Sequence, residues 1–138
     1  MVKVFDFGIS DVSFLANETL AAYQYYFVES AGSAAVGSVA LANSGSATYS
    51  PLGVVQNEPA SGDEATVRMM GSTKVVAAAP GTQILCGHWV TCNGSGQAAY
   101  TSVASLACGF ALSNSDSSAS SIIEMFFDPG MSWLTRKV

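Results

Sequence analysis

The sequence contains few charged residues and very few basic ones. Of its 138 residues 11% are charged, with five Lys and Arg against ten Asp and Glu, for a net charge of −5. The usual charged share is about 25%. Affinity for nucleic acid, and for anionic membranes, draws on clustered Lys and Arg. We therefore expect neither as a direct partner, because the basic residues are scattered and only the last two adjoin. They are Lys3, Arg68, Lys74, Arg136 and Lys137.

Long apolar runs and an even set of cysteines are missing too. No run of about eighteen uncharged apolar residues could span a membrane. The first residues, MVKVFDFGISD, lack the basic-then-apolar order of a secretory signal, so we expect synthesis in a cytoplasm without export by that route. The three cysteines, Cys86, Cys92 and Cys108, argue by their odd number against a disulfide framework. The simplest interpretation makes them small, semi-buried apolar residues.

The spacing Cys-x-His-x3-Cys over Cys86, His88 and Cys92 is the nearest pattern to a chemical site. A structural zinc site needs four thiolate or imidazole ligands, and the fourth would have to be Cys108 or a carboxylate. The usual C-x2-C knuckle and a second histidine are both missing. A cysteine nucleophile with His88 as base would also need a third, orienting group. We therefore predict no metal, no cofactor and no enzymatic activity, with catalysis by Cys86 or Cys108 with His88 as the alternative.

What the sequence does contain is a series of short apolar segments separated by Gly, Pro and Ser turns. Such segments every eight to twelve residues predict an all-β fold with minor α content, a small β-barrel or β-sandwich-like domain. One short helix is expected near residues 13–23 or 100–107. The predicted strands cover residues 20–29, 35–43, 51–57, 65–71, 73–79, 83–92, parts of 98–112, and 121–127. The 83–92 segment is expected as one strand or as two halves bent at Gly87.

The most regular pattern lies in PLGVVQNEPASGDEATVRMMGSTKVVAA, residues 51–78. Pro59 and Gly62 predict a turn. After it, Ala65, Val67 and Met69 alternate with polar or longer residues, as in a half-buried strand. Gly71 is predicted to break this strand before the next one. The stretch NGSGQ at residues 93–97 is the strongest turn signal in the chain, because Asn-Gly supports positive φ.

The order of phrases from FVES at residue 27 to SIIEMFF at residue 127 resembles the small capsid decoration (cement) proteins of tailed bacteriophages, the lambda head-decoration type. These proteins share a G-V-x-x-N/D phrase, a P-x-x-G-E/D turn, a V-x-x-x-G strand and a G-x-A-L phrase. The cysteines and His88 depart from their pattern. The matching positions are Gly53, Val54, Asn57, Pro59, Gly62, Val67, Gly71, Gly87, Val90, Gly109, Ala111 and Leu112.

The resemblance implies a protein of the virion, on the outer capsid surface. Such a protein binds the expanded head as a homotrimer, bridges neighbouring major capsid protein subunits and stabilises the shell against the pressure of the DNA. It implies an extended N-terminal arm over residues 1–20, a β-rich decoration domain over 21–128 and a C-terminal tail over 129–138. The aromatic and apolar residues near the two ends are the predicted capsid or inter-subunit contacts, with closure of the core as the alternative for the first three. They are Phe5, Phe7, Phe14, Trp133 and Leu134.

A second hypothesis is a carbohydrate- or receptor-binding β-module on a virion or cell surface. Exposed aromatic side chains stack on sugars, although burial in the core would explain the same residues. The candidates for stacking are Tyr23, Tyr25, Tyr26, Trp89 and Tyr100.

Overall fold

The computed structural model describes residues 10–43 and 51–129, and in these residues it is almost entirely β. The all-β prediction is confirmed: the described residues form nine strands and one short 3-10 turn, η2, which lies inside the predicted 100–107 span. None of the helices in this part of the chain is long and apolar enough to cross a membrane. The elements are β1 (Ser10–Ala16), β2 (Phe27–Ser30), β3 (Ser38–Leu41), β4 (Gly53–Val55), β5 (Glu64–Ala77), β6 (Trp89–Cys92), β7 (Ala98–Tyr100), η2 (Ala104–Leu106), β8 (Gly109–Ala111) and β9 (Ser121–Phe127).

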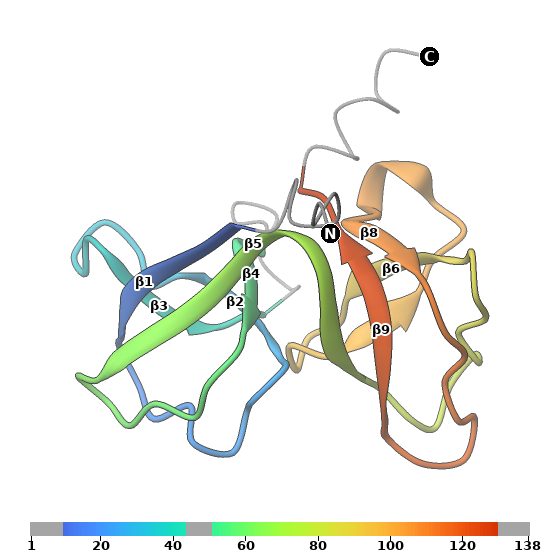
Figure 1. Ribbon diagram of the computed structural model, residues 1–138, viewed down its shortest axis with the longest axis horizontal. Helices are drawn as coiled ribbons and strands as arrows, with labels where there is room; N and C mark the ends of the chain where they lie inside the picture. The colour runs from blue at the N-terminus through green and yellow to red at the C-terminus, as the bar shows by residue number, and fades with distance from the viewer. Residues whose placement is uncertain (1–9, 44–50, 130–138) are drawn as a thin grey trace, which may run out of the picture.

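The strand pairings close two small barrels that share one strand. The first barrel has the order β1-β3-β2-β4-β5 and closes through the β1–β5 pairing. The second has the order β5-β7-β6-β8-β9 and closes through β5–β9. Figure 1 shows β5 in green, running across one lobe and then bending into the other. Closing both sheets leaves few free strand edges in the described structure.

Strand β5 passes through Gly71 without ending, so the predicted break there is wrong. Before Gly71 the strand pairs with β1, and from Gly71 onward it pairs with β9. Gly71 has φ of 105°, a conformation that glycine adopts without a steric cost. The glycine therefore bends the strand from one barrel into the other while hydrogen bonding continues. Burial alternates along most of the strand, with Val67 facing one core and Val75 the other.

The two barrels have separate cores with a shared wall between them. The first core consists of Ala16, Leu20, Val28, Val39, Val55, Ala65 and Val67. The second consists of Phe27, Ala42, Val54, Val75, Ala77, Ile84, Val90, Cys92, Ala98, Cys108, Ala111, Ile123, Met125 and Phe127.

Strands β2 and β4 form that wall. In β2, Phe27 faces the second core and its neighbour Val28 faces the first, and both are fully buried. In β4, Val54 and Val55 divide in the same way. Successive residues of a strand point to opposite faces, so a strand between two cores has apolar residues on both. This accounts for the unbroken run of apolar residues in β4, Gly53–Val55.

Several strands are shorter in the structure than in the sequence pattern, and in two of them a tight turn is the cause. The 20–29 strand begins only at Phe27, after turns in which Tyr25 takes a positive φ of 66°. The 83–92 strand begins only at Trp89, because Gly87 has φ of 87° and the His88 N–H donates to the Leu85 carbonyl at 2.9 Å. In both segments a tight turn replaces the early residues of the predicted strand.

The predicted arm over residues 1–20 is wrong for its described part. Residues 10–16 form β1, which pairs with both β3 and β5 and thereby closes the first barrel. Phe14 is half-buried and packs against the first core. Residues 10–16 form a barrel strand and not an arm because their backbone hydrogen-bonds to both β3 and β5. Residues 1–9 and the tail from 130 onward lie outside the described residues.

Both ends of the described chain lie at the bend in β5. Ser10 is the partner of Met70, and Phe127 is the partner of Gly71. An ion pair also spans this point, because Arg68 binds both carboxylate oxygens of Asp11, at 2.7 and 2.9 Å, and donates to the Ser72 carbonyl at 3.0 Å. Arg68 lowers the pKa of the Asp11 carboxyl through these hydrogen bonds. The segments 1–9 and 130–138 therefore leave the described structure at one place.

Candidate functional site

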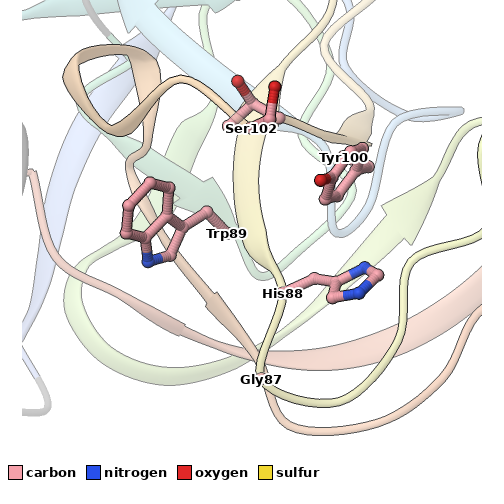
Figure 2. Close-up of a pocket in the computed structure, with 6 residues that line it drawn as sticks. Gly87, His88, Trp89, Tyr100 and Ser102 are labelled. Carbon is pink, nitrogen blue, oxygen red and sulfur yellow. The ribbon is translucent and has the colours of Figure 1, made fainter.

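An open hollow of about 260 Å³ lies where β6 begins and β7 ends. Its lining is aromatic and polar, and none of the lining residues is charged. They are Gly87, His88, Trp89, Tyr100, Thr101 and Ser102. Figure 2 shows Trp89 on one side of the view, His88 and Tyr100 on the other, and Ser102 between them.

A hairpin and a turn bring these residues together. The NGSGQ turn joins β6 to β7, so that Val90 is the partner of Tyr100 and the Thr101 N–H donates to the Trp89 carbonyl at 3.2 Å. Asn93 holds this turn by accepting hydrogen bonds from Ser95 and Gln97 through its side chain. The turn predicted at NGSGQ is thereby confirmed, with its positive φ at Gly96, and the β6–β7 pairing that it allows determines which residues form the hollow.

His88 is held by its own turn. Its Nδ1 accepts a hydrogen bond from the Leu85 N–H at 3.2 Å, and its ring lies 4.8 Å from the ring of Tyr100. A neutral imidazole that accepts at Nδ1 has its proton on Nε2. His88 therefore presents one N–H donor that the Leu85 contact does not use.

Two large aromatic side chains beside the hollow remain exposed to solvent. Trp89 is 40% exposed and Tyr100 is 38% exposed. Within the described residues, the Trp89 Nε1, the Tyr100 hydroxyl and the Ser102 hydroxyl have no hydrogen-bond partner. Because Tyr100 is the partner of Val90, the Trp89 and Tyr100 side chains lie on opposite faces of the β6–β7 hairpin.

Trp89 also begins an aromatic row on the outer face of the second barrel. It lies opposite Phe110, and Phe110 lies opposite Phe126. The last two rings stack at a centroid distance of 5.6 Å. On the same face Leu112 and Ile122 are 41% and 58% exposed. This outer aromatic row is apolar surface on the outside of a barrel.

The structure divides the three cysteines between the surface and the core. Cys86 is exposed, whereas Cys92 and Cys108 are buried in the second core. Burial raises the pKa of the Cys92 thiol to about 12 and raises that of Cys108 further still. Zinc binding and nucleophilic attack both require the thiolate. In the described part of the chain, no group of three or more His, Cys, Asp or Glu side chains is placed to hold a metal ion.

Thiol modification under native conditions tests this placement. We expect a water-soluble thiol reagent at pH 8 to modify one cysteine per chain, Cys86, and all three after denaturation. Cys92 and Cys108 react slowly because they are buried and protonated at this pH. Rapid modification of two or three thiols in the folded protein would contradict the structure. A Cys86→Ser variant is the control, and its folded form should not react.

The residues predicted as contacts are only partly described. Phe14 packs against the first core, and Phe5, Phe7, Trp133 and Leu134 lie outside the described residues.

The five aromatics proposed for sugar stacking divide into two groups. Tyr23 and Tyr26 pack edge to face at 5.2 Å, and Tyr25 packs against the second core. Trp89 and Tyr100 reach the hollow. Ser102 and Thr101 were missed in the sequence, although extending the pairing from the Asn-Gly hairpin would have placed Thr101 opposite Trp89.

Comparison with known proteins yields a shared fold. No family model and no curated protein matches the chain. Among solved structures, it is similar to the N base of the head fiber gp8.5 of bacteriophage phi29, with a TM-score of 0.64 and 18% sequence identity. The similarity covers 88% of this chain and 95% of that one. At this identity the likeness establishes the fold over nearly the whole of both chains.

Proposed function

We propose that this chain is a structural protein of a bacteriophage virion that sits on the outer surface of the head. In this proposal it binds major capsid protein subunits, bridges neighbours and stabilises the expanded shell against internal DNA pressure. The observation that supports it most is the fold shared, over nearly its full length, with the base of a phage head fiber. The sequence resemblance to capsid decoration proteins points to the same part of the virion.

The position of the chain ends supports attachment through one face. The segments with Phe5 and Phe7 and with Trp133 and Leu134 both start from the bend in β5. Two segments that are attached at the same place can contribute apolar residues to one interface. Aromatic anchors contribute much of the binding energy of an interface. We propose that these two segments bind the capsid and that the two barrels form the rigid body they attach.

The chain is proposed to assemble as a homotrimer and to carry out no catalytic step. Two of the three cysteines are buried thiols, and the His88 Nδ1 is occupied by a backbone N–H, which leaves little for a nucleophilic site. Many copies on a lattice would bind strongly even if each contact is modest. The molar mass of the purified chain, measured by light scattering, tests the trimer. A monomeric mass at all accessible concentrations would contradict it.

Removal of residues 1–9 tests the contact segment. We expect the truncated chain to bind purified heads at least about tenfold more weakly, because apolar anchors at an interface each contribute roughly 1–2 kcal/mol or more. The cut leaves β1 whole, and so circular dichroism should show an unchanged fold. Co-sedimentation with the heads of the virus that encodes the chain measures the binding.

The control variant changes an exposed apolar residue within the described part of the chain. Val36 is 88% exposed in the connection before β3, and Val36→Ser should leave binding unchanged. If the truncated chain saturates the heads as the full chain does, the N-terminal segment is not a contact. If neither chain binds, the proposed function itself is wrong.

A further inference from the structure

We propose that residues 130–138 of the free chain dock on the outer aromatic row of the same chain, with Trp133 lying against it. The row consists of Trp89, Phe110 and Phe126, which lie opposite one another on β6, β8 and β9. The inference concerns the chain before it meets any partner, and so it does not depend on a role in the shell.

The row belongs to a continuous apolar surface on the outside of the second barrel. The rings of Phe110 and Phe126 stack at 5.6 Å with an angle of 17° between their planes, and Trp89 beside them is 40% exposed. Leu112 and Ile122 extend the same face. A contiguous apolar patch on the surface of a small domain marks a contact site, whereas single exposed apolar residues do not.

The outer face of the first barrel carries polar pairs in the equivalent place. On that face the Ser13 hydroxyl donates to the Glu64 carboxylate at 2.6 Å, and Arg68 pairs with Asp11 at 2.7 Å. All four residues belong to the ladder between β1 and β5. A barrel wall of this chain that faces water is therefore built differently from the wall that bears the row, which indicates that the row has a partner.

The chain leaves the described structure at the edge of the row. Phe126 is part of the row, and β9 ends at the next residue. The Asp128 N–H then donates to the Cys108 carbonyl at 2.8 Å, so the chain is still held beside the start of β8 just before Pro129. Figure 1 shows β9, in red, ending next to β8. Residues 130–138 therefore start close to the row.

The distance along the chain allows Trp133 to reach every part of the row. The row crosses two strand spacings, from β9 over β8 to β6, which amounts to roughly 10 Å. Four residues lead from Pro129 to Trp133, and an extended chain of this length covers roughly 13 Å. Docking thus requires no change in the described strands.

The composition of the segment suits this surface. It contains Met131, Trp133 and Leu134, together with two of the five basic residues and none of the ten acidic ones. Residues 1–129 hold the other three bases and all ten acids, a net charge of −7, so the segment is attracted to the body that it would cover. Covalent attachment gives the segment an effective concentration on the order of millimolar, which makes even a weak contact well occupied.

Docking would also hide the apolar residues of the segment until a partner takes them. Trp133 and Leu134 are proposed above as capsid contacts. A capsid subunit that binds them would remove them from the row, and this exchange, unlike the docking itself, rests on the proposed function. Before the exchange, the docked segment would present less apolar surface to other chains.

Acrylamide quenching of Trp89 fluorescence tests the docking in the chain alone. The chain has two tryptophans, so each replacement of Trp133 leaves Trp89 as the one indole. The Trp133→Phe chain keeps an aromatic ring in the segment, whereas a chain with Met131→Ser, Trp133→Ser and Leu134→Ser keeps only its length and charge. We expect the quenching constant of Trp89 to be about twofold or more higher in the triple variant, because the docked segment shields the indole in most molecules.

A matched control changes an exposed apolar residue of the first barrel. Leu15 is 54% exposed on β1, and Leu15→Ser in the Trp133→Phe chain should leave the quenching of Trp89 unchanged. Circular dichroism checks that each variant folds.

A reciprocal measurement follows Trp133 itself. The Trp89→Phe chain leaves Trp133 as the one indole and keeps an aromatic ring at each position of the row. Adding Phe110→Ala should then raise the quenching constant of Trp133, by about twofold, because the middle of the row is lost.

Three results would overturn the docking. One is equal quenching of Trp89 in the Trp133→Phe chain and the triple variant. The second is protection that increases with the concentration of the chain, which would assign the row to a second copy. The third is a Trp89 that is open in the free chain and protected on heads, which would assign the row to the capsid. Protection of Trp89 in a chain that binds no heads would support the docking and refute only the role in the shell.

Discussion

Phe27→Ala is expected to lower the free energy of unfolding by about 3–5 kcal/mol, as large-to-small replacements of buried aromatics do. Phe27 is fully buried in the wall strand β2, and its ring centroid lies 6.0 Å from that of Phe127 across the second core. The next residue, Val28, is part of the first core. Removing the ring leaves a cavity beside the strand that separates the two cores, where the backbone cannot move inward without disturbing both.

Denaturant unfolding followed by far-UV circular dichroism measures this loss. The control is Val36→Ala at an 88% exposed position, for which a change within about 0.5 kcal/mol is expected. Because β2 and β4 belong to both cores, the parent and Phe27→Ala should each unfold in one transition. A loss below about 1 kcal/mol, or two separate transitions, would show that the wall does not join the barrels as described.

Gly53→Ala is expected to cost stability at or above the upper end of the roughly 1–3 kcal/mol typical of overpacking. A Cβ at Gly53 would lie 2.2 Å from the Arg68 carbonyl oxygen and 2.7 Å from the Val67 Cγ1. The nearer atom is backbone, and Arg68 is the partner of Val54 in the β4–β5 ladder. Relief of the clash therefore requires β4 to separate from the shared strand.

Gly81→Ala provides the matched control, because a Cβ there meets nothing within 4 Å. It should leave stability unchanged or raise it by up to about 1 kcal/mol through a less flexible unfolded chain. Thermal unfolding of the two variants beside the parent makes the comparison. Equal effects of the two substitutions would mean that β4 and β5 are not in close contact at Gly53.

Much of the fold follows from local patterns in the sequence. The strand SIIEMFF has the residues predicted for it, Ser121–Phe127, because a run of β-favouring residues ends at Asp128 and Pro129. The turn at NGSGQ was also predicted, although its positive φ of 74° lies at Gly96 and not in the Asn93-Gly94 pair. The course of β5 could not be predicted, because a glycine with positive φ ends one strand and bends another, and the difference here depends on the distant partners β1 and β9.

The candidate site was only partly predictable for a similar reason. Trp89 and Tyr100 were among five aromatic candidates, and local sequence gives no way to separate them from Tyr23, Tyr25 and Tyr26. What separates them is whether each ring meets a core, a neighbouring ring or solvent, which depends on contacts between distant segments. The phrase Cys86-x-His88 suggested metal or thiol chemistry, but the register of β6 places Cys92 inside the barrel and His88 at the hollow.

The position of the chain on the particle tests the central proposal most directly. Antibodies raised against the purified chain can be applied to intact, purified particles of the virus that encodes it, and labelled particles examined by electron microscopy. The proposed function predicts label on the outer surface of filled heads, with the chain also detected by mass spectrometry of the same particles. Absence of the chain from purified particles, or label confined to the tail, would contradict it.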